Sequence, residues 1–508
     1  MGDSKVADFY ENQHVLITGA TGFMGKVLVE KLLRSCPKIG TIYLLIRNKK
    51  GKESAQRLNE FLNCPIFEQL KNNQKDVFNK LQVVQGDVTF NNLNLNNQDF
   101  TLLKDNVTMI FHMAANVRFD QALKPAVLMN TGGTKNVLDL ACHFKQLLSF
   151  VHVSTSYCHC DETELKEQTY PVADNPMKIL DMVQWMRPEV IKSITPHLLK
   201  NSPNTYAYTK ALTEQLVNEY STVLPVAIAR PSIVTASVEE PFPGWVDNLN
   251  GPTGIFVGAG KGVIRTMYCN PDLFADLVPV DCVINSLILI GWKRAVERKN
   301  ETDVYHIVAN RDNQISWGRA LEIGRRHFFN NPFSVCLWYP GGGFNSNYFL
   351  HMLTVIFLHY IPAYFVDFLM ILTRNKPFLV RTQNRITNGL SMLQYYTTRP
   401  WYFHDDKLRS LYKKLNETDR KTFFPTCIMI DYDRYILNYI LGARKYCVRE
   451  DPETIPHAKR VLKRLYYLDL VKNILLFCLF MWIFVYISGF FLNLDTSIHS
   501  GVKHVVVK

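Results

Sequence analysis

A tyrosine and a lysine four residues apart, Tyr206 and Lys210, are the side chains of this sequence best suited to proton transfer. Residues four apart in a helix share one face and lie about 6 Å apart along its axis. An ammonium group at that distance favours the phenolate and should lower the pKa of the tyrosine, which at about 10 is a poor proton relay at neutral pH. The spacing therefore predicts carbonyl reduction with Tyr206 moving the proton. Tyr208 points about 160° away from Lys210 around the helix, and we expect it to pack in the core.

Three consecutive hydroxyl residues, Ser154, Thr155 and Ser156, follow a predicted buried strand at 150–153. Ligands of parallel sheets bind beyond the carboxyl ends of the strands, so these hydroxyls are placed to donate a hydrogen bond to a substrate carbonyl oxygen. We take Thr155 as the first candidate, with Ser154 and Ser156 as alternatives. Together with the tyrosine and the lysine they form the predicted catalytic set.

A glycine-rich turn near the amino terminus predicts a dinucleotide site. Gly19, Gly22 and Gly25 separate an aliphatic run at 15–18 from an amphipathic pattern at 27–34, which is the strand–turn–helix context that the fingerprint needs. The glycines would permit the tight turn, the approach of the pyrophosphate to the helix N-terminus, and the packing of helix on strand. Their GxxGxxG spacing is typical of extended short-chain dehydrogenases/reductases. The other residues expected at the cofactor here are Thr18, Thr21, Phe23 and Met24.

The residues after the predicted strand at 41–46 favour NADPH over NADH. An NAD site would place an acidic residue there for the ribose 2′-hydroxyl, whereas this chain has Arg47-Asn48-Lys49-Lys50. Arg47 could hold a 2′-phosphate through two hydrogen bonds, and a basic solvated loop is the alternative. Further cofactor contacts are expected after later strands, at Asp87, Val88, Ala114, Ala115, Pro231 and Ile233.

The first two thirds of the chain alternate predicted strands with predicted helices. This alternation predicts an α/β fold: a Rossmann-like, doubly wound parallel sheet covered on both faces. A helical C-terminal domain and a C-terminal transmembrane helix are expected to follow it. We divide the chain into a reductase domain at 1–335, a helical domain at 336–470, a transmembrane helix at 473–494 and a short tail at 495–508.

Composition narrows the partners. The 508 residues carry a formal charge of +12, which favours anionic partners such as nucleotide phosphates, coenzyme A or an acidic membrane face. We find no recognisable nucleic-acid module. The eleven cysteines are scattered and odd in number, which indicates reduced thiols. Cys158-His159-Cys160 has no second Cys/His pair at zinc spacing, so we expect no metal site.

An uncharged apolar stretch, 473–492, is long enough to span a bilayer. Five basic residues precede it between 459 and 472, and the tail carries fewer, so the positive-inside tendency places the main body in the cytosol. The apolar stretch 344–373 is interrupted by Pro362, two histidines and Asp367. We interpret it as an interfacial or substrate-facing hairpin, with a second span as the alternative.

These residues together resemble the alcohol-forming fatty acyl-CoA reductases, and among them the insect-type enzymes. The resemblance runs through the glycine turn, Thr155 with Ser154, and Tyr206 with Lys210. It continues over nearly the whole chain, in 230–232, 243–248, 251–262, 278–281, 305–317, 362–368 and 401–446. It implies that two NADPH reduce long-chain acyl-CoA to a primary alcohol and free coenzyme A through a bound aldehyde. Wax, ether-lipid, hydrocarbon or pheromone synthesis would use the product.

The glycine-rich stretch 251–262 lies inside a segment, 236–275, that we interpret as a flexible substrate lid. Lys261 and Arg265 would contact coenzyme A, and Trp245 is a further substrate-binding candidate; a plain surface loop is the alternative. Aromatic residues of the C-terminal half, Trp401, Phe423, Tyr432 and Tyr435, would wall the path of the acyl chain, with core packing as the alternative.

Other functions share part of this pattern. A membrane-bound hydroxysteroid dehydrogenase has the glycine turn, the Tyr/Lys pair and an anchor, a nucleotide-sugar epimerase needs no anchor, and a non-catalytic NADPH-binding scaffold needs no catalytic set. The ending Val-Val-Lys508 favours the endoplasmic reticulum membrane over the peroxisomal membrane. The sequence leaves open the acyl chain length and the oligomeric state, with a homodimer among the alternatives.

Overall fold

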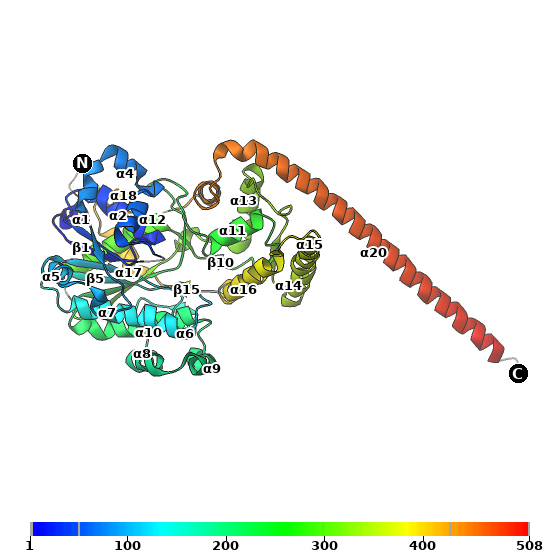
Figure 1. The fold of residues 1–508 in the computed structure, drawn as a ribbon, viewed down its shortest axis with the longest axis horizontal. Coiled ribbons are helices and arrows are strands. Elements are labelled where there is room, and N and C mark those ends of the chain that lie inside the picture. The colour runs from blue at the N-terminus through cyan, green and yellow to red at the C-terminus, as the bar shows by residue number, and fades with distance from the viewer. Residues whose placement is uncertain (1–3, 49–50, 298, 426–428, 506–508) are drawn as a thin grey trace.

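A seven-stranded parallel sheet forms the centre of the computed structural model, which describes residues 4–48, 51–297, 299–425 and 429–505, the last sixteen by backbone only (Figure 1). The strand order is β12-β7-β5-β4-β1-β2-β3. The strands are β1 Val15–Thr18, β2 Ile42–Ile46, β3 Leu81–Gln85, β4 Met109–His112, β5 Ser149–Val153, β7 Val226–Pro231 and β12 Asp303–Ile307. The order reverses between β1 and β4, which is the doubly wound arrangement expected from the sequence.

Helices cover both faces of the sheet, so every central strand is buried along its whole length. One face carries α2 (Phe23–Ser35) and α12 (Val280–Val296), whose aliphatic residues form one core with the strands. The opposite face carries α7 (Gly133–Ala141) and α10 (Thr205–Glu219). The Rossmann-like fold predicted from the sequence is confirmed.

The carboxy-terminal half is helical, as expected. Beside the sheet lie α11 (Pro252–Gly260), α13 (Trp317–Asn330), α16 (Leu379–Thr397) and α19 (Tyr432–Gly442). Other helices of the first part of the chain are α1 Lys5–Phe9, α3 Ser54–Leu62, α4 Glu68–Asn73, α5 Asn97–Asn106, α6 Leu123–Val127, α8 Pro176–Trp185 and α9 Pro188–Leu199. Short strand pairs join the two halves: β8 (Ile233–Thr235) with β11 (Leu277–Pro279), β9 (Thr266–Tyr268) with β14 (Gly343–Asn345), and β6 (Glu164–Leu165) with β15 (Tyr402–Phe403).

Two helices of the carboxy-terminal half return to the sheet. Leu408 and Leu411 of α17 (Asp406–Lys413) belong to the core beneath α2 and α12. Asp419 of α18 (Glu417–Thr422) accepts hydrogen bonds from the backbone of Lys5 and Val6 at the start of α1. The segment after 335 is therefore interwoven with the sheet, and the boundary at 335 stays a prediction.

Within the part of the chain that the structure describes, two helices are long and apolar enough to cross a membrane. One is the stretch Tyr348–Leu372, made of α14 (Tyr348–Val355), a π-helical turn η7 (Ile356–Tyr360) and α15 (Ile361–Leu372). The other is Pro452–Gly489, made of the short η9 turn (Pro452–Thr454) and most of α20 (Ile455–Val505), a helix that projects away from the body (Figure 1). The stretch predicted to span the bilayer lies within α20; the side chains of 490–505 and the residues 506–508 of the predicted tail lie outside the described part.

Candidate active site

The glycine turn between β1 and α2 is built for close backbone approach. Gly19 has φ +76°, and a Cβ atom there would lie 2.9 Å from the backbone nitrogen of Ala114. A Cβ atom on Gly25 would lie 2.4 Å from the carbonyl oxygen of Gly19. Gly22 is the N-cap of α2 and makes no side-chain cap, so the helix N-terminus keeps N–H groups for an anion. The turn fits a dinucleotide pyrophosphate.

Thr18 does not face that turn. Its hydroxyl is fully buried, lies 2.7 Å from Nδ1 of His112 and accepts hydrogen bonds from the backbone nitrogens of Met113 and Ala114, both at 3.2 Å. Thr18 therefore ties β1 to the end of β4 rather than touching a cofactor through its side chain. Ala114 and Ala115, which follow β4, are partly exposed, as a cofactor contact requires.

Two arginines gather where the ribose of a dinucleotide would lie. Arg47, after β2, pairs with Asp87, after β3, at 3.2 Å. Arg57 of α3 donates to Oγ1 of Thr21 at 3.0 Å and also to the carbonyl oxygen of Arg47. Burial, and then the neighbouring charge of Arg47, lower the pKa of Arg57. Two cations held this close favour an anion between them. Lys49 and Lys50 lie outside the described residues.

The Asp87 carboxylate is able to accept a hydrogen bond from a ligand. Burial raises its pKa, but hydrogen bonds from Thr89 and the charge of Arg47 outweigh this and keep the pKa below its ordinary value. Val88, next to it, is buried. The carboxylate is thus ionised at neutral pH and suited to an amino group.

The predicted catalytic residues meet beyond the carboxyl end of β5. Thr155 is buried, and its side chain interacts with the Tyr206 phenol. Ser156 donates its hydroxyl to the carbonyl oxygen of Arg230 at 2.7 Å, which removes it from the candidates. The hydroxyl of Ser154 is buried and has no partner among the described residues. Lys210 donates to the carbonyl oxygen of Val153 at 2.7 Å and stays beneath the same strand end.

The electrostatics of the pair differ from our expectation. Burial raises the pKa of Tyr206, Cys158 adds to the rise, and the hydrogen bond with Thr155 opposes it. Lys210 is not among the causes, so its predicted effect on the phenol is absent from this structure. Burial lowers the pKa of Lys210 to about 8, although the negative charge of Glu214 opposes this change. The expectation for Tyr208 holds: it packs in a core cluster and donates to Asp174.

A buried ionic network lies one helical turn below Lys210. Glu214 accepts hydrogen bonds from Nε of Arg230 at 2.9 Å and from Nη2 at 2.5 Å. His159 lies 3.1 Å from the same carboxylate, and the Cys158 thiol donates to it at 3.2 Å. Burial raises the pKa of Glu214, but the charge of Arg230 outweighs it and holds the pKa well below its ordinary value.

This network also bears on metal binding. Cys158, His159 and Glu214 offer potential ligand atoms within 4.8 Å of one another. However, the guanidinium of Arg230 already neutralises the carboxylate and would repel a cation. We therefore interpret the cluster as the ionic support of α10.

The helical half completes the site, which the sequence did not predict. The side chain of Asn204 caps α10 by accepting from the backbone of Ala207, and its amide donates to the Tyr396 hydroxyl at 2.9 Å. The ring of Phe119 lies 5.6 Å from both Tyr206 and Tyr396. A residue of α16 thus positions the amino end of the catalytic helix, and an aromatic wall stands beside the phenol.

The expected flexible lid is a packed helix. Residues 252–260 form α11, with Pro252 at its start. A Cβ atom on Gly258 would lie 2.6 Å from the Ile264 side chain, and one on Gly260 would lie 2.6 Å from Phe328. The glycines therefore serve close packing, and the prediction of a flexible loop is wrong for this stretch.

Two of the three predicted substrate contacts, Trp245 and Arg265, have other partners. Trp245 is buried, and its ring packs on Phe242 and Tyr446, so it belongs to the core. Arg265 is largely buried and lies 3.9 Å from Asp469 of α20, which directs it toward the anchor. Lys261 caps the end of α11 and remains partly exposed.

Phe423 and Tyr432, which were expected to line the path of the acyl chain, make other contacts. Phe423 is fully buried in the core of the sheet face, whereas Trp401 packs on Tyr157 beside the aromatic wall. Tyr432 donates to the backbone of Asn313. Pro231, the last residue of β7, is buried, and Ile233, the first residue of β8, is partly exposed.

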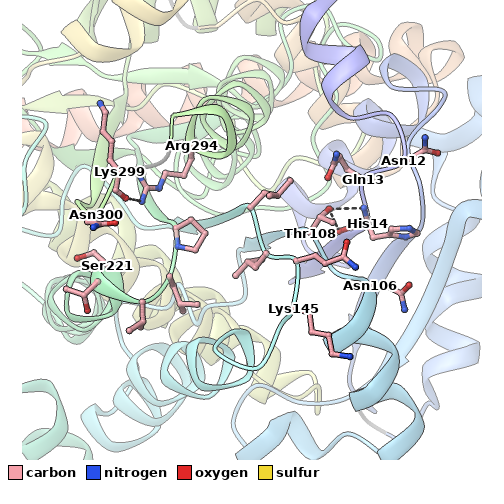
Figure 2. Close-up of a pocket in the computed structure, with 17 residues that line it drawn as sticks. Asn12, Gln13, His14, Asn106, Thr108, Lys145, Ser221, Arg294, Lys299 and Asn300 are labelled. Atoms are coloured by element: carbon pink, nitrogen blue, oxygen red, sulfur yellow. Dashed lines mark hydrogen bonds between the residues drawn. The ribbon is translucent and has the colours of Figure 1, made fainter.

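Figure 2 shows a polar hollow of about 730 Å³ at the other edge of the sheet. Its residues precede the strands: His14 comes before β1, Thr108 before β4 and Pro225 before β7. Ligands of doubly wound sheets bind at the opposite edge. The cations that line it are paired, for example Lys145 with Asp105 and Arg294 with Asp303. The hollow is therefore not the active site.

Comparison with known proteins agrees with this geometry. Two family profiles, both described as "Male sterility protein", match residues 17–287 and 358–450. Fatty acyl-CoA reductase 1 of Rattus norvegicus is 37% identical over 481 residues, which cover 95% of this chain and 93% of the relative. Fatty acyl-CoA reductase 2 of Bos taurus is 38% identical over 474 residues, which cover 93% and 92%.

Solved structures share the fold at lower identity. The reductase domain of a nonribosomal peptide synthetase from Mycobacterium tuberculosis superposes with a TM-score of 0.58 at 19% identity, covering 87% of this chain and 96% of that one. The terminal R domain of the myxalamid pathway gives 0.55 at 19% identity, covering 87% and 95%. These likenesses support the Rossmann-like architecture.

Proposed function

The chain belongs to the fatty acyl-CoA reductase family, and on that premise we propose that it reduces long-chain fatty acyl-CoA to the primary alcohol with NADPH and releases coenzyme A. The overall reaction takes one acyl thioester, two NADPH and two protons to alcohol, free thiol and two NADP⁺. A nicotinamide cofactor follows from the family and the fold. The phosphorylated form is the finer proposal, supported by Arg47 and Arg57 at the ribose position.

The catalytic residues act on the carbonyl oxygen. The bound nicotinamide supplies hydride in each of two rounds. Thr155 and Tyr206 donate hydrogen bonds to the oxygen, which stabilises the negative charge that develops as the carbon is reduced. In the first round the adduct loses the thiolate and leaves an aldehyde; in the second, Tyr206 gives its proton to the alkoxide. Lys210, charged below pH about 8, would hold the ribose next to the nicotinamide.

One observation carries this assignment: the hydroxyls of Thr155 and Tyr206 interact with each other at the carboxyl end of β5, with Lys210 beneath the same strand end. A scaffold that only binds a dinucleotide has no need of this arrangement. Ser154, buried beside it with an unpartnered hydroxyl, is the second candidate for the oxygen contact.

The test is direct turnover. The full chain in detergent micelles or vesicles should oxidise NADPH when given long-chain acyl-CoA, with two NADPH consumed per fatty alcohol recovered by mass spectrometry. If no long-chain thioester caused NADPH to be oxidised, the assignment would be overturned. Oxidation of NADH at the same efficiency would overturn only the cofactor proposal.

We further propose that the outer helix Tyr348–Leu372 lies in the surface of a lipid bilayer. Every fourth residue is buried, namely His351, Val355, His359, Ala363 and Asp367. Around this stripe the helix exposes large apolar side chains over its whole length, a surface of the kind that marks a membrane or protein contact. They are Tyr348, Phe349, Leu350, Met352, Leu353, Ile356, Phe357, Leu358, Ile361, Tyr364, Phe365, Val366, Phe368, Leu369, Ile371 and Leu372.

The two histidines and the aspartate that interrupt the apolar run all make contacts on the buried side of the helix. His351 lies 3.0 Å from the Thr266 hydroxyl, and His359 accepts from the backbone of Arg265 at 2.9 Å. Asp367 accepts from three backbone nitrogens at the start of α16. These contacts hold the helix along the body at three levels, which favours a helix lying in the membrane surface over one that crosses it. This supports the interfacial arrangement over a second span.

A lipid crosslinking experiment tests this face. A photoreactive amino acid in place of Phe357, 61% exposed, should form adducts with vesicle lipids, whereas the same residue in place of Trp185, 74% exposed on α8, should form none. Adducts at neither position would contradict the proposal. We propose the endoplasmic reticulum membrane with a cytosolic body, and microscopy against reticulum and peroxisome markers decides between the two organelles.

A further inference from the structure

A small apolar cavity lies between α11, α13 and α19. Its volume is about 60 Å³, several times the roughly 10–15 Å³ that one water-sized group needs. Phe256, Phe328, Phe329, Ile440 and Ala443 are among its walls. Water would find few polar partners among such side chains, and apolar cavities of this kind take apolar ligands. We call this cavity the tail slot.

Two glycines in the wall of the tail slot lie directly against phenyl rings. A Cβ atom on Gly260 would lie 2.6 Å from Phe328 and 2.9 Å from Phe333. A Cβ atom on Gly324 would lie 3.2 Å from Phe256 across the slot. Larger residues at either position would push phenyl rings into the space, so the opening depends on these glycines.

Helix α19 connects the tail slot with the strand that follows the expected nicotinamide position. The Tyr435 hydroxyl lies 2.7 Å from Thr235 of β8 and donates to the carbonyl oxygen of Ala236. Strand β8 follows Pro231, where the nicotinamide is expected. One turn further along α19, Tyr439 lines the slot and bonds to Thr253 of α11. From Tyr435 to Ala443 the helix rises about 12 Å.

The other end of the tail slot leads to the anchor. Residues 340–342 line the slot, and Arg325 donates to the carbonyl oxygen of Gly342. Just before them, the Tyr339 ring packs on Phe329 at 5.8 Å and on Tyr466 of α20 at 5.4 Å. The slot therefore lies between the cofactor strand and the base of the membrane helix.

We propose that the tail slot receives the methyl end of the acyl chain and sets the longest chain that the protein reduces. This rests on the proposed acyl-CoA reduction. The occupant is an alkyl chain because the walls are apolar and because the cavity lies between β8, next to the expected nicotinamide position, and the membrane helix α20. Tyr339, which packs on the wall residue Phe329, also packs on Tyr466 of that helix. The small volume suits the last carbons of a chain rather than its whole length.

The experiment compares kcat/KM of the full chain across saturated acyl-CoA thioesters of increasing length. Gly324→Ala and Ala443→Leu fill the slot and should lower kcat/KM about tenfold for the longest substrates, the equivalent of about two methylenes left unburied, while sparing shorter ones. Phe329→Ala enlarges it and should move the optimum to longer chains. Ala320→Val changes a buried residue of the same helix that does not line the slot, and should leave the profile unchanged.

Each outcome is decisive. An unchanged length profile in both the filling and the enlarging variants, or an equal loss at all lengths, would mean an ordinary packing void and would overturn the proposal. A shift of the profile in Ala320→Val would also overturn it, because the effect would then not depend on the slot. Failure of the unmodified chain to reduce any acyl-CoA would instead refute the proposed function.

Discussion

Replacement of Arg57 by alanine should change which nicotinamide cofactor the protein uses. Its guanidinium is fixed by Thr21 at 3.0 Å and by the backbone of Arg47, beside the ribose position. A hydrogen bond to a charged group contributes about 1.5–3 kcal/mol, so the loss of one such contact to a 2′-phosphate should lower kcat/KM for NADPH about 10- to 150-fold. The value for NADH, which lacks the phosphate, should stay the same.

Arg47→Ala should act in the same direction. It removes one cation and leaves the ionised carboxylate of Asp87 without its partner beside the phosphate position. The assay is steady-state oxidation of each cofactor at saturating acyl-CoA. Lys52→Ala is the matched control, since Lys52 is exposed in the same region and pairs only with Glu60 among the described residues. Equal losses with NADPH and NADH would refute the reasoning, because the arginines would then only shape the loop.

Four further outcomes follow from the site. Tyr206→Phe should lower kcat by about 10²–10⁴ with unchanged dinucleotide affinity; retained turnover would contradict its role. Because burial lowers the pKa of Lys210 to about 8, kcat should fall as the pH rises past that value and the ammonium is lost, and a rate that stays flat well above pH 8 would exclude this. Glu214→Gln leaves a guanidinium buried without its counter-charge, and should cost about 3–5 kcal/mol in the free energy of unfolding by urea titration and move the alkaline fall to lower pH; wild-type stability would show that the ion pair contributes little. Gly25→Ala should abolish dinucleotide binding in a fluorescence titration, since the new Cβ would lie 2.4 Å from a carbonyl oxygen, and normal affinity would disprove the clash.

The sequence predicted those features that depend on residues close together in the chain. Buried strands, the glycine turn and the Tyr/Lys spacing are local patterns, and a parallel sheet brings their ends to one edge whatever the rest of the chain does. This is why the sheet and the gathering of Thr155 and Tyr206 could be expected without coordinates.

The contributions that were missed come from distant segments. Tyr396 reaches Asn204 across 192 positions of the chain, and no local pattern reports such a contact. Arg57 belongs to a helix that carries no dinucleotide motif, although it touches Thr21. The glycines of α11 were interpreted as flexibility because the sequence does not reveal which side chains press against them; Phe328 and Ile264 do so.

The return of α17 and α18 to the sheet limits how this chain can be divided. Leu408, Leu411 and Phe423 cover apolar strands and helices more than a hundred positions earlier, and Asp419 fixes the first helix. A fragment cut at residue 335 would present that apolar face to water and should aggregate when expressed alone. A recombinant joined at this boundary would therefore keep the core only where its carboxy-terminal helices preserve these apolar contacts and the Asp419 hydrogen bonds.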